Sequence, residues 1–62
     1  MEVTIEYLDA LGAREERRII PIELRFRSEH PHGENQWLLD VWDVKLHARC
    51  TLAMKNIREW RL

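Results

Sequence analysis

The chain has 62 residues, of which 45% are hydrophobic and 34% are charged, and these are the proportions of one small globular domain rather than of a disordered tail. Its 10 Lys and Arg against 11 Asp and Glu exclude a strongly basic field for nucleic acid, and its apolar runs are shorter than the roughly 20 residues that span a bilayer. The single cysteine, Cys50, excludes an internal disulfide, and together with an acidic N-terminal segment unlike a signal peptide it predicts a cytoplasmic protein.

Apolar and polar residues alternate along most of the chain, which is typical of half-buried β-strands. In chain order the pattern predicts five short strands, at residues 2–8, 17–27, 36–43, 47–54 and 60–62. Turns are expected between them, with Gly12 after the first strand and a cluster of turn residues at 28–35 after the second. Residues 55–57 are expected to form one helical turn before the last strand. Apolar residues do not recur at helical spacing over two turns, so the pattern predicts a small all-β barrel or sandwich in one domain, residues 1–62.

The second predicted strand contains a proline, which has no N–H to donate to a neighbouring strand. We therefore expect a bulge or an open edge at Pro21. Residues 14–17 are all charged and are expected on an exposed hairpin arm. The inward positions of all strands are assigned to one core: Val3, Ile5, Tyr7, Ile20, Ile22, Leu24, Phe26, Trp37, Leu39, Val41, Cys50, Leu52, Met54, Ile57 and Trp60.

The third predicted strand has a second tryptophan that the core does not need. Trp37, Leu39 and Val41 point inward, so Trp42 is expected on the outward side of this strand, together with Leu38 and Asp40. Basic residues are expected on the same side or just beyond it: Arg25, Arg27, Arg49, Lys55 and Arg58. Arginine beside an exposed tryptophan can hold phosphates and stack a base. Charged outer faces also keep edge strands soluble, and that simpler interpretation stays open.

No pair of residues has the spacing of a catalytic or metal site. His47 and Cys50 are three residues apart on one predicted strand, so their side chains point to opposite faces. Asp40 and Asp43 are separated in the same way. The two histidines of the turn at 28–35 lack the further ligands that a metal requires. We therefore expect no catalysis, no cofactor and no metal, and Cys50 is expected to be a buried, inert thiol.

Four short blocks follow one another across residues 3–60. They are Ile5-Glu6-Tyr7, Arg18-Ile19-Ile20-Pro21-Ile22-Glu23-Leu24, Trp37-Leu38-Leu39 and Thr51-Leu52-Ala53-Met54-Lys55-Asn56-Ile57. In order and spacing they resemble the blocks of WYL domains, whose pattern runs roughly I-x-Y, R-x-x-P-x-x-L, W-Y-L and R-T-F-x-L/M-x-x-I. Two positions depart from this pattern, because Leu38 takes the place of the tyrosine and Cys50 that of the arginine.

The resemblance implies a five-stranded SH3-like (Sm-like) barrel with a short helical turn before the last strand. It also implies a ligand-sensing module of bacterial transcription regulators, with a nucleotide-like anion or single-stranded nucleic acid as ligand and a DNA-binding regulator as partner. We expect a free-standing, non-catalytic module, a monomer or weak dimer, with Arg18, Trp42, Arg49 and Lys55 as its ligand-binding residues. The alternative is a protein–protein interaction module that binds no nucleic acid.

Overall fold

The computed structural model of the chain describes residues 1–28 and 33–62. These residues form β-strands and one turn of 3-10 helix, and none of them lies in an α-helix. In chain order the elements are β1 (Val3–Leu8), β2 (Arg14–Arg27), β3 (Gln36–Asp43), β4 (Ala48–Ala53), η1 (Met54–Asn56) and β5 (Ile57–Arg61). The predicted all-β class is confirmed, and a helical turn precedes the last strand as expected.

Two strands begin earlier than the alternation predicts. β2 begins at Arg14, because the charged residues that were expected on an exposed arm pair with β1. Arg14 lies opposite Leu8, and its Nη1 donates to Glu6 Oε1 at 3.0 Å. β5 begins at Ile57, directly after η1. Oppositely charged side chains on the two strands therefore extend the β1–β2 hairpin beyond the apolar segment.

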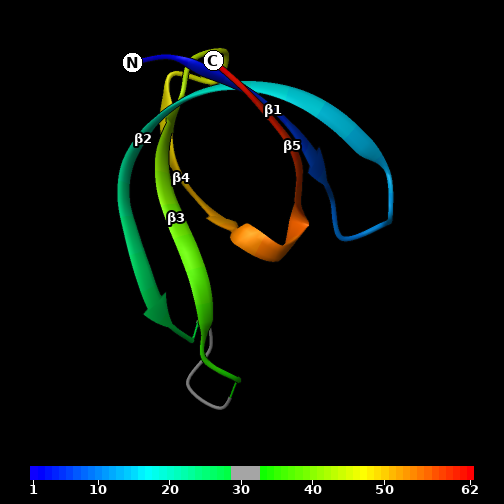
Figure 1. Cartoon of the computed structure of the whole chain (residues 1–62), viewed down its shortest axis with the longest axis vertical. Coiled ribbons are helices and arrows are strands. Elements are labelled where there is room, and N and C mark those ends of the chain that lie inside the picture. Colours follow the sequence, from blue (N-terminus) through cyan, green and yellow to red (C-terminus); the bar gives the residue numbers. More distant parts are fainter. Residues whose placement is uncertain (29–32) are drawn as a thin grey trace.

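The five strands in the described residues form one antiparallel sheet in the order β4-β3-β2-β1-β5. The sheet curls, as Figure 1 shows, and the side chain of Tyr7 in β1 reaches β4, although the two strands are not neighbours in the sheet. The backbone N–H of Ala53 in β4 donates to the hydroxyl of Tyr7 in β1 at 3.3 Å. β4 and β5 are the two edges and are joined through η1, and in the part of the chain that is described no ladder between them closes the sheet.

A bulge interrupts β2 next to its proline. Pro21 lies opposite Val41, whereas Glu23 lies opposite Asp40, the preceding residue of β3. Ile22 is therefore an extra residue on β2, which is the definition of a β-bulge. The bulge expected at the proline is confirmed.

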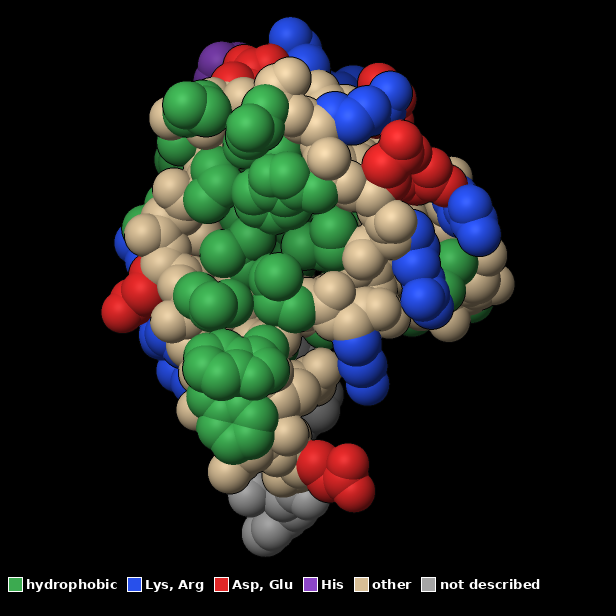
Figure 2. Space-filling model, viewed as in Figure 1, with side chains coloured by type: hydrophobic (Ala, Val, Ile, Leu, Met, Phe, Trp, Pro, Cys, Tyr) green, Lys and Arg blue, Asp and Glu red, His purple; other side chains and the backbone are tan. Residues whose placement is uncertain are grey.

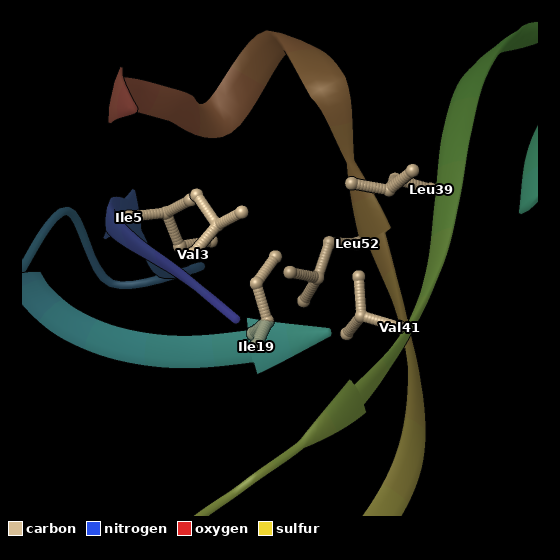
Figure 3. Close-up of a cluster of buried hydrophobic side chains, with 6 residues drawn as sticks. All are labelled: Val3, Ile5, Ile19, Leu39, Val41 and Leu52. Atoms are coloured by element: carbon tan, nitrogen blue, oxygen red, sulfur yellow. The ribbon is translucent and has the colours of Figure 1, made fainter. Parts of the chain in front are cut away.

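Six aliphatic side chains form the buried core inside the curled sheet: Val3, Ile5, Ile19, Leu39, Val41 and Leu52 (Figure 3). Partly buried residues that pack against this core are Tyr7, Cys50, Met54 and Ile57. Cys50 lies opposite Val41, so its thiol is on the core side as the alternation predicts, although the residue is only partly buried. All five strands thus contribute to one core.

Part of the predicted core is wrong, since six of its residues are exposed: Ile20, Ile22, Leu24, Phe26, Trp37 and Trp60. The bulge explains the first of these, because it shifts the alternation by one residue, so that Ile19 is fully buried and Ile20 is 37% exposed. Leu24, Phe26 and Trp37 are on the predicted side of the sheet. They are exposed because β1 pairs with β2 only up to Ile19 and does not reach their end of the hairpin.

Burial also departs from strict alternation on the edge strand β5 and on the outward side of the sheet. Trp60 lies opposite Ile5 on the inward side, but β5 is an edge strand and the ring remains 43% exposed. Leu38 and Ala53 lie opposite one another on the outward side, and both are buried. The outward side of the sheet is therefore not uniformly exposed.

The predicted turn after β1 is held by an aspartate. Asp9 Oδ1 accepts hydrogen bonds from the backbone N–H groups two and four residues further on, at 2.8 and 2.9 Å. Gly12 has a φ of 84°, which glycine adopts without steric cost. The predicted turn at 28–35 lies partly outside the described residues, and so do its histidines, His30 and His32.

Candidate functional site

Trp42 and Arg49, two of the predicted ligand-binding residues, lie side by side on the outward side of the sheet. They are direct partners across β3 and β4, a position in which side chains contact one another. Trp42 is 39% exposed, and the side chain of Arg49 is 60% exposed. The structure therefore places a tryptophan and an arginine at facing positions of adjacent strands, with both side chains exposed.

Arg18, a third predicted residue, lies on the same side of the sheet in β2, the strand that flanks β3 opposite to β4. It is two residues from Ile20, which lies directly opposite Trp42, so Arg18 and Trp42 are diagonal neighbours. Arg18 Nη1 lies 3.6 Å from Glu2 Oε2 in an exposed ion pair, and such pairs hold a side chain only weakly. We call Arg18, Trp42 and Arg49 the outer site.

Lys55, the fourth predicted residue, is not brought to this site. It lies in η1, beyond the end of β4, whereas Arg49 lies near the beginning of that strand. The four residue steps from Arg49 to Ala53 alone span about 13 Å of extended chain. A ligand at the outer site would therefore contact Lys55 only if it extended along the whole of β4.

A buried carboxylate lies next to the outer site and joins three strands. Asp40 in β3 is 1% exposed. Its Oδ2 lies 2.5 Å from Arg25 Nη2 in β2 and 3.5 Å from Arg49 Nη2 in β4, and its Oδ1 accepts from the Thr51 hydroxyl at 2.9 Å. The alternation places all four residues on the outward side, but it does not give the register that brings them together, and the sequence therefore did not reveal this cluster.

The surroundings of Asp40 act on its pKa in opposite directions. Burial raises the pKa of the carboxyl, because the charged form loses contact with water. Hydrogen bonds from Arg25, Thr51 and Arg49, and the positive charge of Arg25, lower the pKa, and the result lies below the ordinary value for an aspartate. Asp40 is therefore ionised at neutral pH. Its negative charge lies closer to the guanidinium of Arg25 than to that of Arg49.

A pocket of about 270 Å³ adjoins Arg18, between the first part of β2 and the turn after β3. Its lining residues are Glu15, Glu16, Arg17, Arg18, Asp43, Lys45 and Leu46. Arg17 is paired with Glu15, and Asp43 Oδ1 accepts from the backbone N–H of Leu46 at 2.9 Å. Three acidic and three basic side chains line the pocket, so it has no preference for an anion.

The two residue pairs that were considered as catalytic candidates, His47 with Cys50 and Asp40 with Asp43, are not close together in the structure. His47 is exposed in the turn before β4 with a φ of 51°, whereas Cys50 packs against the core. Asp40 faces outward, and Asp43, which lies opposite Ile19, faces inward. Among residues 1–28 and 33–62, no group of three His, Cys, Asp or Glu side chains is placed to hold a metal ion.

No helix within the described ranges is both long enough and apolar enough to cross a membrane. Comparisons with family models, with curated proteins and with solved structures found no match to the chain. The function proposed below therefore depends on the geometry of the outer site and on the sequence resemblance.

Proposed function

We propose that the chain is a non-catalytic, WYL-like ligand-binding module of bacterial transcription regulation, and that its outer site binds short single-stranded nucleic acid or a nucleotide-like anion. The observation that supports this most directly is the pairing of exposed Trp42 with exposed Arg49, with Arg18 as a diagonal neighbour. Tryptophan rings stack bases, and guanidinium groups bind phosphates through two parallel hydrogen bonds.

The spacing of the outer site suits one stacked base with a phosphate on each side. Arg18 and Arg49 are separated by two strand spacings and about two residue steps, so their backbones are roughly 12 Å apart. Trp42 lies on the strand between them. A base stacked on the ring would therefore have a cationic side chain on either side.

Asp40 limits the affinity of such a site. It compensates Arg25 and lies 3.5 Å from Arg49, so a phosphate must compete with it for part of the guanidinium. Arg49 is nevertheless largely exposed, and a guanidinium has five N–H donors. We therefore expect weak binding that depends on salt.

The proposal includes an SH3-like barrel architecture. The strand order β4-β3-β2-β1-β5, the curl of the sheet and the 3-10 turn between β4 and β5 support it. So does the hydrogen bond from Ala53 to Tyr7, which links β4 to β1. In this architecture the outer site lies on the outside of the barrel wall.

Fluorescence anisotropy of a labelled thymidine oligonucleotide tests the proposal at low salt. The wild-type chain should raise the anisotropy, and Trp42→Ala should weaken binding by about tenfold, since stacking of one base contributes roughly 1–3 kcal/mol. Arg18→Ala and Arg49→Ala should each weaken binding and reduce the slope of log affinity against log salt by about one.

Two control variants match these changes in type. Trp60→Ala removes an exposed tryptophan from β5, and Lys55→Ala removes a cation away from the outer site. Both should leave the affinity for an oligonucleotide too short to extend along β4 within about twofold, because neither side chain would then contact the ligand stacked on Trp42. A flat titration with oligonucleotides and nucleotides alike would contradict the proposal, as would equal losses in the control variants.

The alternative function, a protein–protein interaction module, is favoured by the two open edges of the sheet. Among the residues that the structure describes, β4 and β5 each have a strand neighbour on one side only, and an edge strand can pair with an extended segment of another protein. If this alternative holds, Trp42→Ala should abolish capture of the protein partner as a contact anchor is removed. The combined change of Arg18, Arg49 and Lys55 to alanine should then have little effect.

A further inference from the structure

The apolar side of the β2–β3 hairpin continues beyond the core. Leu24 lies opposite the core residue Leu39, and Phe26 lies opposite Trp37. The rings of Phe26 and Trp37 are in contact, with their centroids 5.1 Å apart. We call Leu24, Phe26 and Trp37 the hairpin face. It is on the inward side of the sheet, opposite to the side that carries the outer site.

The hairpin face exposes a large apolar area. Leu24 is 52% exposed, Phe26 is 56% exposed and Trp37 is 53% exposed. An aromatic side chain buries roughly 150–250 Å² when it is covered, so the three half-exposed side chains together offer roughly 300 Å². Figure 2 shows that this surface belongs to a band of apolar side chains that runs down the molecule to the end where β2 stops and β3 begins. The largest apolar patch on a typical monomer is of about this size and is often functional.

The interior of the chain is small for a domain that folds without support. Its core cluster consists of six aliphatic side chains. One cysteine cannot form an internal disulfide, and the described residues contain no group of side chains placed for a metal. Oligomerisation is one way in which small domains that lack these supports gain stability. A second copy of the chain, placed over the hairpin face, would extend the core across the interface.

The charges of the chain also favour a second copy over a strongly charged partner. Acidic and basic side chains both border the apolar band (Figure 2), and the formal net charge is −1. Two copies can therefore approach without strong repulsion, and in a two-fold arrangement a basic group of one copy can face an acidic group of the other. A nucleic acid would instead be matched by a border of basic side chains.

We propose that two copies of the chain associate through the hairpin face about a two-fold axis, so that the two faces cover each other. A standard interface buries about 800 Å² on each partner, and one chain exposes 4657 Å² in all. The roughly 300 Å² of the hairpin face would form the apolar centre of such an interface. The polar border of the band would supply the remainder, as in other interfaces with an apolar core and a polar rim.

Sedimentation equilibrium over the micromolar range tests the association directly. The mass of the wild-type chain should rise with concentration from 7.6 kDa to a plateau at twice that value. Leu24→Lys and Trp37→Lys should each weaken dimerisation by at least about 100-fold, because each places two charges in the apolar centre. Leu11→Lys is the matched control, since Leu11 is 94% exposed in the turn after β1, and it should leave the dissociation constant unchanged.

Three results would overturn the proposal. The first is a wild-type chain whose mass stays at 7.6 kDa throughout the concentration range. The hairpin face would then be a binding surface for a different protein. The second is a dimer that survives both Leu24→Lys and Trp37→Lys while their far-ultraviolet circular dichroism shows a folded sheet. The third is a mass that grows without a plateau, because a closed two-fold interface stops at two copies. The oligonucleotide titration is separate from all three, as it reports on the outer site.

Discussion

The carboxylate of Asp40 is buried on the outward side of the sheet, where it holds Arg25 from β2 and Thr51 from β4. Removal of one partner from a buried pair leaves the other charge uncompensated. Asp40→Asn should therefore lower the free energy of unfolding by about 3 kcal/mol, the low end for a buried pair, because Arg25 keeps 31% of its side-chain exposure. Urea denaturation followed by circular dichroism measures the change.

The same residue makes stability depend on pH in a defined window. The pKa of Asp40 is lowered in the folded chain, so its ionisation stabilises the fold above the unfolded-state pKa of about 3.9. This contribution is lost as the pH falls through the lower, folded-state pKa. The difference in unfolding free energy between the wild type and Asp40→Asn should therefore shrink below about pH 4. Glu59→Gln is the control, because its 3.9 Å contact with Arg61 is exposed, and its loss should leave the unfolding free energy nearly unchanged at any pH.

At the scale of the element, the bulge in β2 determines which of two adjacent isoleucines stabilises the core. Ile19 lies before the bulge and is fully buried, whereas Ile20 lies on the outward side opposite Trp42. Ile19→Ala should cost about 3 kcal/mol, as expected for a large-to-small change in a core, and Ile20→Ala should cost less than about 1 kcal/mol. The two variants carry the same chemical change, and urea denaturation compares them. Equal costs, or a larger cost at Ile20, would show that the alternation is not shifted by the bulge.

The elements themselves were largely predictable, but the faces of β2 were not. Alternation gave residues 36–43 as a strand with the bounds that β3 has, because its inward positions up to Val41 are all apolar and the turn residues at 28–35 mark where it begins. Pro21 indicated the bulge, since proline lacks the N–H of a regular ladder. A bulge adds one unpaired residue to the strand, so the inward positions before the bulge are shifted by one residue relative to those after it. An alternation that is continued across the bulge therefore assigns Ile20 to the wrong side of the sheet.

The candidate site was predictable only in part, because alternation gives the side of a strand and not the register between strands. Trp42 and Arg49 were assigned to the outward side, and the register makes them direct partners. The same register places Lys55 beyond the far end of β4. It also brings Asp40 between Arg25 and Arg49, a contact between strands that no single-strand pattern contains.

At the scale of the whole molecule, the sheet exposes two chemically different surfaces on its two sides. The outer site has exposed cations around a tryptophan, and the hairpin face is apolar. Association through the hairpin face would leave both outer sites of a dimer accessible. Ligand binding and dimerisation should therefore be separable by mutation, with Arg49→Ala affecting the former and Leu24→Lys the latter.

Dimerisation would make the thermal stability of the whole molecule depend on its concentration, because only the folded chain associates. An unfolding enthalpy of about 0.7 kcal/mol per residue, applied to two chains of 62 residues, predicts that Tm rises by about 6 °C for each tenfold increase in concentration. Differential scanning calorimetry of the wild type and of Leu11→Lys should show this rise. Leu24→Lys should unfold at a lower Tm that is the same at all concentrations, since a monomer gains nothing from mass action. A wild-type Tm that does not change with concentration would mean that the six aliphatic residues of the core maintain the fold in a single chain, and that the exposed hairpin face has another role.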